Sequence, residues 1–409
     1  MGVARPPHGW SDFSLIASLI SPNDDRASPA GLRFSFAAGL SGVPASEWNA
    51  LFDSGYPFAR HAFLSALETY SCVGESTGWL PRHLLVHRDG KLVGAAPLYL
   101  KLHSYGEFVF DFAWAEASHS IRRPYYPKLL NAIPFVPAVG PRIGAIDSAV
   151  REAVAEQLTA LVEAESLSSA HTLFVADDQA EAYRRAHWLE RHDLQFQWFN
   201  RGDADFSTFA GRFSSDKRKK MLRERRRVAE AGLRFETRRG DELDEAAWMA
   251  VYTLYANTYE ERGQAPYLTP DFLLGYGAAP GSPFRVILGY EGAHLIAAAL
   301  TLQGGDTLYG RHWGAADRYH SLHFECCYYQ GIELCLREGL RRYDAGTQGE
   351  HKLARGFTPV LTRSLHHLAE PRLRDAVEHF LQRERRAVAA RGVELMHHSP
   401  YRHDPTPTV

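Results

Sequence analysis

The sequence predicts an α/β protein built from two similar modules, each containing a mixed β-sheet flanked by helices. The main support is an internal repeat. The order strand, turn, strand, turn, strand occurs twice, and the first strands of the two copies begin at Leu84 and Phe284. Helical sequence precedes each copy, and a helix and a strand follow it. Because helices alternate with strands after an antiparallel set, we expect a mixed sheet with helices on both faces.

The first copy of the repeat lies between residues 84 and 114. Asp89-Gly90 separates its first two strands, and this dipeptide favours a tight hairpin turn. The predicted strands cover residues 84–87, 92–100 and 106–114. An alternating strand (32–40) and two helices, one beginning at Pro44 and one over 62–70, precede them. A helix (147–165) and strands at 171–176 and 195–200 follow.

The second copy has the same order of elements. Glu291-Gly292 and Gly304-Gly305 supply its two turns. The predicted strands cover residues 284–289, 294–302 and 306–314, after a helix over 243–262. A helix over 322–338 follows and ends at Gly339, and strands at 341–346 and 363–369 complete the copy.

The domain prediction follows from these elements. A flexible N-terminal extension covers residues 1–30, and the first module covers 31–200. The second module covers 201–395 and begins with a basic linker helix over 215–231, in which Met221, Leu222 and Val228 form a narrow apolar stripe. A C-terminal tail covers 396–409.

Composition limits the possible classes of function. The 409 residues carry 46 basic and 48 acidic side chains, a net charge of -2, which excludes a protein devoted wholly to nucleic acid. No apolar run reaches the length of about 18 residues that a membrane span needs. Cys72, Cys326, Cys327 and Cys335 show no metal-ligand spacing, which predicts reduced, buried thiols in a cytoplasmic protein. A short apolar piece at residues 15–20 leaves a weak targeting peptide as the alternative.

Four segments resemble the FemAB-like family of peptidoglycan biosynthesis or recognition proteins, within the GNAT (acyl-CoA N-acyltransferase) superfold. They are residues 97–114, 125–142, 323–333 and 346–359, and the resemblance extends over roughly residues 33–395. It implies tandem GNAT-like modules, each a mixed twisted sheet flanked by helices. Fem ligases move an amino acid from aminoacyl-tRNA to an amine of a peptidoglycan precursor. The resemblance therefore implies an N-acyltransferase or aminoacyltransferase with its site in an inter-module cleft.

Two features depart from these relatives. The segment before Leu322 reads GAADRYHS, in place of the Gly-rich pyrophosphate loop of acetyl-CoA enzymes, and the coiled-coil arms of some Fem ligases are missing. The donor therefore stays open between an acyl-CoA thioester and an aminoacyl-tRNA. We expect either to act as a substrate, with no permanently bound cofactor.

Polar side chains of the second module are candidates for acyl transfer. This reaction needs a polarised carbonyl, a base for the amine proton and a held donor, but no covalent nucleophile. His323 and Glu325, at the start of a predicted helix, are the candidate general bases. The candidate donor- or substrate-binding residues are Arg311, His312, Trp313, Gln348, Glu350, His351, Lys352 and Arg355. The alternative is a salt-bridged structural network.

The first module mixes aromatic and charged residues that are candidates to line a groove for a peptide, a sugar or a nucleotide. They are Lys101, His103, Tyr105, Asp111, Trp114, Tyr125, Tyr126 and Lys128. The alternative is an aromatic core with solvated charges. We expect this module to be mostly structural, because residues 139–150 lack a polar cluster like that of the second module.

The basic helix carries eight Lys or Arg residues between Lys217 and Arg227. Clustered cations neutralise phosphates, so this surface is a candidate for binding tRNA. The candidate contacts are Lys217, Arg218, Lys219, Lys220 and Arg223. A solvated helix face with no ligand is the alternative.

Histidine is abundant, but its spacing does not favour a metal site. His366-His367 and His397-His398 are adjacent pairs, and adjacent strand residues point to opposite faces. No HExxH or paired Cys/His pattern occurs, and we expect no metal. Two functions remain: acyl transfer to a small-molecule or peptide amine, or non-catalytic recognition of a peptide, glycan or nucleotide by a GNAT-like protein.

Overall fold

The computed structural model describes residues 19–20, 26–27, 31–316, 319–347 and 349–402. These residues form two compact units. Within the described ranges, the N-terminal unit comprises the chain up to Asp193 together with residues 362–388, and the C-terminal unit comprises residues 194–361 and the chain from Ala389 onward. The predicted extension (1–30) lies outside the described residues except for two short pieces, and the predicted tail is described as far as Arg402.

Two sets of paired strands form the N-terminal unit. The first set is antiparallel and runs in the order β1 (Arg26–Ala27), β2 (Arg33–Ala37), β4 (His83–Arg88), β5 (Lys91–Ala96) and β8 (Gly144–Ala145). The second runs in the order β3 (Trp79–Pro81), β6 (Tyr99–Lys101), β7 (Lys128–Asn131), β9 (Ser169–Thr172) and β16 (Thr358–Leu368), and β7 and β9 are parallel. The mixed sheet predicted for this module is confirmed.

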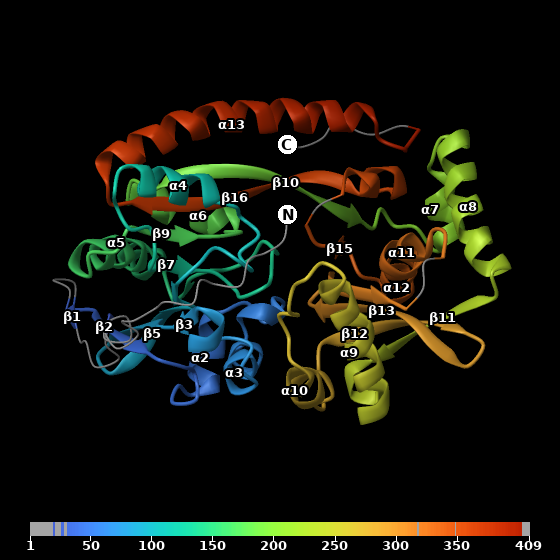
Figure 1. Cartoon of the computed structure of the whole chain (residues 1–409), viewed down its shortest axis with the longest axis horizontal. Coiled ribbons are helices and arrows are strands. Elements are labelled where there is room, and N and C mark those ends of the chain that lie inside the picture. The colour runs from blue at the N-terminus through green and yellow to red at the C-terminus, as the bar shows by residue number, and fades with distance from the viewer. Residues whose placement is uncertain (1–18, 21–25, 28–30, 317–318, 348, 403–409) are drawn as a thin grey trace. The chain divides into compact units, whose positions relative to one another are not determined.

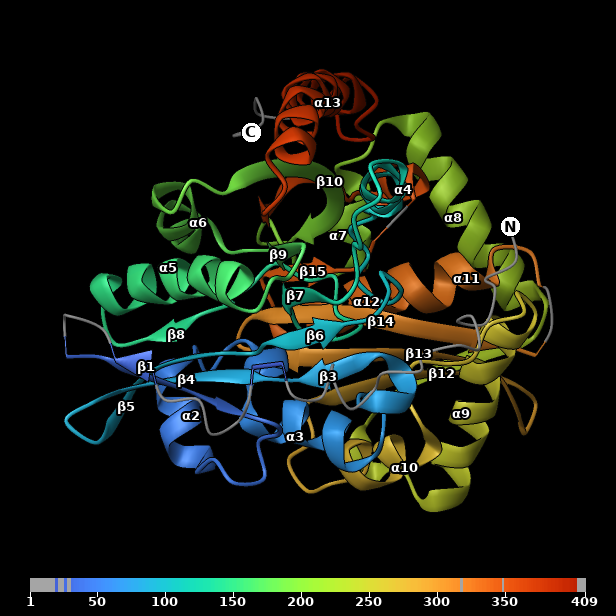
Figure 2. The same ribbon diagram turned by 60° about the vertical axis from the view of Figure 1, so that its left-hand side comes forward.

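Helices cover these strands. They are α2 (Ala45–Leu51), α3 (His61–Thr69), α4 (Phe112–Ser120), α5 (Ser148–Ala164), α6 (Asp177–Arg185) and the N-terminal part of α13 (Pro371–His397). In α5, Val150, Val154, Leu158 and Leu161 recur at helical spacing and are buried in the main core of the unit. Figures 1 and 2 show α5 beside β9, on which it packs.

Two strand predictions in the first copy of the repeat were wrong. The strand predicted over 92–100 is divided into β5 and β6 at Pro97, which has no N–H for a strand ladder. The strand predicted over 106–114 is a loop followed by α4. Gly106 and Phe108 have φ of 80° and 62°, and the side chains of the loop bind buried lysines, so the segment cannot continue the ladder. β7 pairs with β6 in its place.

The second copy of the repeat is confirmed as an antiparallel meander in the C-terminal unit. The strand order is β11 (Leu233–Arg239), β12 (Phe284–Glu291), β13 (His294–Gly304), β14 (Thr307–Ala315), β15 (Arg342–Asp344) and β10 (Leu189–Phe199). Only the β14–β15 pair is parallel. β10 and β16 carry the chain from one unit to the other. A mixed α/β architecture with helices against both modules' sheets therefore matches the predicted fold class.

Helices pack on this sheet as well. α9 (Glu245–Glu260) lies against β13 and β14 (Figure 1), with the short α10 (Pro270–Phe272) after it. The helix predicted over 322–338 is confirmed as α11 (Leu322–Phe324), a π-helical turn η5 (Glu325–Tyr329) and α12 (Gln330–Glu338). Gly339 ends it with a φ of 68°.

The basic helix is confirmed as α8 (Ser215–Glu230), preceded by α7 (Phe206–Gly211). Met221 and Val228 are buried, but Leu222, expected in the same apolar stripe, is 48% exposed. Glu224 is buried instead, because residues 221, 224 and 228 share one helix face and Leu222 does not. No helix in the described part of the chain has the length and apolarity needed to cross a bilayer.

Candidate functional site

Predicted site residues of the C-terminal unit gather where β14 and β15 separate. The two strands pair only over Thr307–Tyr309 and Arg342–Asp344. Beyond that point β15 ends, while β14 continues to Ala315 through Arg311, His312 and Trp313. One edge of β14 therefore has no partner in β15 at the residues that the sequence singled out.

Two cations fix the chain after β15. The Arg311 guanidinium lies 3.4 Å from Asp344 Oδ1, and both side chains are almost fully buried. Lys352 Nζ donates to three backbone carbonyls, those of Ala345 (3.0 Å), Gly346 (2.6 Å) and Thr347 (3.3 Å). Burial lowers the pKa of Lys352 to about 8. This arrangement shapes the loop beside the free edge of β14.

His323 on α11 lies in an aromatic setting. Its ring centroid is 4.7 Å from that of Trp313 and 5.2 Å from that of Tyr328. Burial, then the charges of His351, Lys352 and Arg355, lower its pKa to about 4. The His323 imidazole is half-buried and uncharged at neutral pH, so it can accept a hydrogen bond from a nearby amine.

Glu325, the second predicted base, is held by other side chains. Arg225 Nε lies 3.2 and 3.1 Å from its two oxygens, Arg225 Nη2 lies 2.9 Å from Oε1, and Gln330 also donates to Oε1. A second Arg225 bond, of 2.7 Å, reaches Glu333. A buried carboxylate saturated in this way fixes α8 against η5 and is poorly placed to take a proton from substrate.

A second network holds Glu224, the residue of α8 before Arg225. Arg355 Nη2 donates to Glu224 Oε1 at 2.8 Å, and the Tyr329 hydroxyl donates to Glu224 Oε2 at 2.5 Å. The Arg355 guanidinium also lies 3.3 Å from the centroid of the Phe324 ring. Arg355 therefore joins α8, α11 and the segment after β15.

The four other predicted residues of this unit, His312, His351, Glu350 and Gln348, differ in their surroundings. His312 is half-buried, with its Nδ1 3.2 Å from the Tyr259 hydroxyl, and desolvation and the charge of Arg311 lower its pKa to about 3. His351 is near the site, with its Nε2 2.9 Å from the Tyr328 hydroxyl. Glu350 instead pairs with Arg391 of α13. Gln348 lies outside the described residues.

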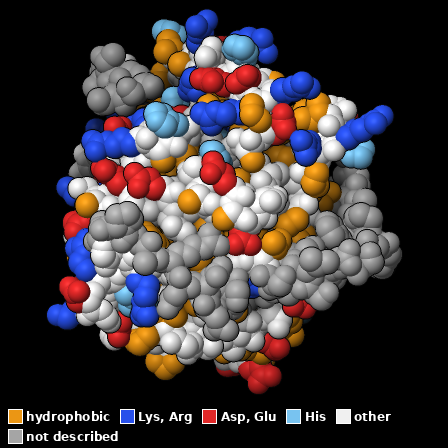
Figure 3. All heavy atoms as spheres, turned by 90° about the vertical axis from the view of Figure 1, so that its left-hand side faces the viewer, with side chains coloured by type: hydrophobic (Ala, Val, Ile, Leu, Met, Phe, Trp, Pro, Cys, Tyr) orange, Lys and Arg blue, Asp and Glu red, His pale blue; other side chains and the backbone are white. Residues whose placement is uncertain are grey.

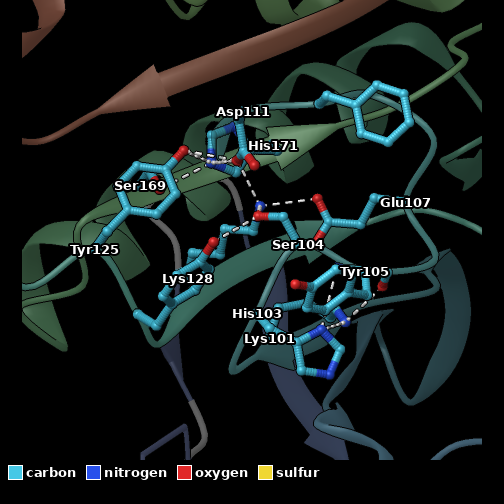
Figure 4. Close-up of polar contacts among 12 residues, drawn as sticks. Lys101, His103, Ser104, Tyr105, Glu107, Asp111, Tyr125, Lys128, Ser169 and His171 are labelled. Atoms are coloured by element: carbon cyan, nitrogen blue, oxygen red, sulfur yellow. Dashed lines mark hydrogen bonds and ion pairs between the residues drawn. The ribbon is translucent and has the colours of Figure 1, made fainter. Parts of the chain in front are cut away.

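The N-terminal unit contains a buried ionic cluster that Figure 4 shows around Lys128. Lys128 Nζ lies 2.5 Å from Asp111 Oδ2, 2.8 Å from Glu107 Oε2 and 2.8 Å from Ser104 Oγ. Burial disfavours the charged amine, but Asp111 and Glu107 outweigh this effect and raise the pKa of Lys128. Burial raises the pKa of Glu107 to about 7. We call Lys128, Ser104, Glu107 and Asp111 the Lys128 hub.

Lys101 lies below the Lys128 hub in Figure 4, beside His103 and Tyr105. Its Nζ stands 3.9 Å from the centroid of the Trp79 ring and donates to the Tyr105 carbonyl at 3.3 Å. Burial holds the pKa of Lys101 well below its usual value. His103 Nε2 donates to the Thr77 carbonyl at 2.8 Å. These contacts fix the start of the loop between β6 and α4.

A chain of hydrogen bonds continues from Asp111 to the strands. The Tyr125 hydroxyl donates to Asp111 Oδ2 at 2.7 Å and lies 3.2 Å from His171 Nε2. His171 Nδ1 lies 2.8 Å from His366 Nδ1, whose ring meets Trp114 edge to face. Burial lowers the pKa of His171 to about 3 and that of His366 as well. Four of the predicted residues thus belong to one buried network: Asp111, Trp114, Tyr125 and Lys128.

Most of the predicted residues are therefore brought together, each set within its own unit, whereas Glu350 pairs with Arg391 instead. The sequence prediction missed Glu107, Ser104, His171 and His366, and it did not foresee a buried ionic cluster in the module expected to be mostly structural. A signal was present: Glu107 and Asp111 are the two acids in an otherwise aromatic segment. Within the described chain, no three His, Cys, Asp or Glu side chains gather as a metal site would require.

The profile of one family matches residues 39–403, and that family is described as peptidoglycan biosynthesis/recognition. The chain belongs to the FemAB-like family. No curated protein matches this FemAB-like chain. The family assignment confirms the resemblance found in the sequence.

Solved structures with a similar fold are distant in sequence. "Crystal structure of FemX" is 13% identical, with a TM-score of 0.49 over 82% of this chain and 98% of that one. A "tandem GNAT protein from the clavulanic acid biosynthesis pathway" is 13% identical, with a TM-score of 0.44 over 83% and 99%. "The structure of L-PGS from Bacillus licheniformis" is 8% identical, with a TM-score of 0.48 over 81% and 98%.

Proposed function

We propose that this FemAB-like protein transfers an acyl or aminoacyl group to an amine, with the chemistry at the free edge of β14 in the C-terminal unit. One observation carries the proposal: His323 is half-buried and uncharged, and its ring packs at a tilt of 60° against Trp313, on the part of β14 that β15 does not cover. An uncharged base beside an open strand edge suits an incoming amine.

In the proposed reaction the amine nitrogen attacks the donor carbonyl and forms a new amide bond. The bond to the leaving sulfur or oxygen breaks, and the leaving group takes up a proton. His323 accepts the hydrogen bond of the attacking amine. Arg311 and Lys352 keep the loop after Asp344 in position, and the Trp313 ring flanks the reacting groups. Glu325 positions α8 rather than taking a proton.

The proposed donor is an acyl-CoA thioester or an aminoacyl-tRNA, and the proposed acceptor is a small-molecule or peptide amine. α8 offers the surface proposed for tRNA phosphates. Ion pairs of Glu224 and Arg225 fix the inner side of this helix. A surface hollow of about 610 Å³ lies on its outer side. Its lining residues are Asp216, Lys219, Leu222, Arg223 and Arg226. The cations proposed to bind phosphate are Lys217, Arg218, Lys219, Lys220 and Arg223. The proposed location of the protein is the cytoplasm.

Thermal unfolding with candidate donors tests the proposal first. Acetyl-CoA, a longer acyl-CoA, CoA alone and charged tRNA are compared, since a ligand at about 100 times its Kd stabilises by about 2.7 kcal/mol. With the donor that binds, His323→Ala should lose at least about tenfold in transfer rate while keeping the thermal shift. His294→Ala, an exposed histidine on β13, is the matched control. An unchanged rate in His323→Ala would reject its role.

A second function, recognition without catalysis, is favoured by a specific observation. Glu325 and Lys352 are each saturated by protein partners, and Arg355 is ion-paired with Glu224, as expected of a structural network. If a peptide or nucleotide stabilises the protein, while no donor is consumed over hours, this second function replaces the first.

A further inference from the structure

We propose that Arg225 of α8 is a positioning residue, which holds His323 at the free edge of β14 by stabilising the π-helical turn η5. This inference rests on the proposed function, because it concerns the imidazole proposed to bind the acceptor amine. In this role Arg225 acts through Glu325 and Glu333, and not on the reacting groups themselves. All four residues belong to the C-terminal unit.

The helix that carries His323 changes its hydrogen-bond pattern two residues after it. His323 lies in α11, η5 begins at Glu325, and α12 begins at Gln330. The N–H of Gln330 donates to the Glu325 carbonyl, five residues back, instead of the four-residue spacing of an α-helix. Such turns are rare and occur frequently at functional sites. The direction of His323 relative to α12 therefore depends on η5.

The π-helical turn brings two carboxylates onto one side of the helix. An α-helix rotates by about 100° per residue, so Glu325 and Glu333, eight positions apart, would differ in direction by about 80°. The turn accommodates one extra residue, which reduces the difference to about 20°. Both carboxylates then face the same partner. In a continuous α-helix, His323 would be rotated by about 100° relative to α12.

One guanidinium joins these two carboxylates. Arg225 Nη1 donates to Glu333 Oε1 at 2.7 Å, and Arg225 Nη2 donates to Glu325 Oε1 at 2.9 Å. The Glu325 side chain is 4% exposed and that of Arg225 is 22% exposed. Charge-assisted hydrogen bonds are strong, and the planar guanidinium fixes the relative direction of its partners. Arg225 therefore stabilises η5 in preference to a continuous α-helix.

The residue before Arg225 holds the other end of the turn. Glu224 accepts a hydrogen bond from the hydroxyl of Tyr329, the last residue of η5, at 2.5 Å. Within the turn, the Tyr343 hydroxyl donates to the Cys327 carbonyl. Arg225 binds the first residue of η5 and also α12, so it is the side chain that spans the whole turn.

The surroundings of His323 make its pKa a measure of its position. Its ring centroid lies 4.7 Å from that of Trp313, and the titratable groups near it are Tyr328, His351, Lys352 and Arg355. Burial, then the charges of His351, Lys352 and Arg355, lower the pKa of His323 to about 4. If the ring turned toward solvent, both effects would weaken, and the pKa would rise toward its ordinary value.

NMR titration of the His323 ring in the full chain tests the proposal without any donor. The loss of one signal in His323→Ala assigns the resonance. In Arg225→Gln we expect the pKa of His323 to rise by at least about one pH unit. Glu333→Gln, which removes the 34% exposed carboxylate, should raise it less. Arg226→Gln should leave it unchanged, because Arg226 is exposed and pairs with Glu230 of its own helix.

Two outcomes would overturn the proposal: an unchanged pKa of His323 in Arg225→Gln, or an equal change in Arg226→Gln. Circular dichroism of each variant checks that it is folded. If Arg225→Gln does not fold, Glu333→Gln decides, and an unchanged pKa in that variant would overturn the proposal.

Kinetics separate this inference from the proposed function. With a donor that binds, Arg225→Gln should lower kcat about tenfold and change KM much less, because it moves the base and leaves the binding groups in place. If His323→Ala keeps the parent rate while Arg225→Gln shifts the pKa of His323, the proposed function fails and the structural coupling stands.

Discussion

Single residues of the N-terminal unit show how a buried charge organises a loop. Lys128 is fully buried, and three side chains of one loop converge on its amine. Taking the amine from water is costly, and the two carboxylates offset that cost only while all partners are present. We therefore expect that removing one partner lowers the free energy of unfolding more than removing the whole set of charges does.

Lys128→Met tests this dependence. It leaves Glu107 and Asp111 buried without their cation, so we expect a loss of about 3–5 kcal/mol in the free energy of unfolding, measured in urea. The triple variant Lys128→Met, Glu107→Gln, Asp111→Asn removes the stranded charges and should recover part of that loss. A loss below about 1 kcal/mol in the single variant would contradict a tightly coupled hub.

Because of Glu107, the free energy of unfolding is expected to depend on pH. Its pKa is raised by burial from 4.5 to about 7, so the folded protein binds a proton that the unfolded chain releases. The contribution of Glu107 to stability is fully present below pH 4.5 and is lost as pH rises to about 7, by up to about 3 kcal/mol.

Glu107→Gln should remove this part of the pH dependence. Urea unfolding between pH 4.5 and 8 is compared for the two proteins, and the difference in their unfolding free energies should favour Glu107→Gln increasingly as pH rises. The hub would not titrate as described if that difference stayed constant across the range.

At the scale of elements, the close packing of a helix on a strand leaves no room for a side chain at certain positions. α9 packs on β14 at Gly314, where an added Cβ would stand 1.8 Å from the Leu254 carbonyl oxygen. No rotamer change can relieve a clash with backbone, so only glycine fits while α9 keeps this position.

Gly314→Ala is therefore expected to destabilise the protein by about 3 kcal/mol or more, read from urea unfolding. Gly211→Ala is the matched control. Its added Cβ would meet nothing within 4 Å, and its backbone is not left-handed. The control should change stability by no more than about 0.5 kcal/mol. Equal effects of the two substitutions would contradict direct backbone contact between α9 and β14.

One face of α8 packs against the protein, and the other face is exposed to solvent. Its inward Glu224 and Arg225 are ion-paired, whereas Lys219 and Arg223 are exposed. If the outer face binds tRNA phosphates, Lys219→Gln or Arg223→Gln should each reduce the slope of log K against log salt by about one. Filter binding at several salt concentrations measures this slope. Arg337→Gln, exposed on α12, should leave it unchanged.

At the scale of the whole molecule, opposite charges nearly cancel. The net charge is -2 and the isoelectric point is about 6.9. Figure 3 shows acidic and basic side chains interspersed over one face. A protein with so little net charge repels its own copies weakly. We expect its solubility, measured by precipitation with polyethylene glycol, to be lowest near pH 7 and to rise on both sides. A solubility that changes in one direction only would contradict this expectation.

The elements that the sequence predicted well have strong local signals. Glu291-Gly292 and Gly304-Gly305 mark the turns of the β12–β14 meander, and Gly339 marks the end of α12. The wrong strand at residues 106–114 has aromatic residues at alternating positions, which favour a strand. Its carboxylates bind Lys128, which lies on another strand, and no local pattern reports such a contact.

The sequence by itself determined the family, the α/β class, the order of strands β12 to β14 and the basic face of α8, because periodicity, turn residues and charge are local properties of the chain. The tertiary structure decided which polar residues meet. Glu325 pairs with Arg225, 100 positions away, and His171 meets His366, 195 positions away. Whether a carboxylate or imidazole is a base, an ion-pair partner or a buried support depends on its neighbours in space, since burial and charge at close range set its protonation and its free hydrogen-bonding capacity.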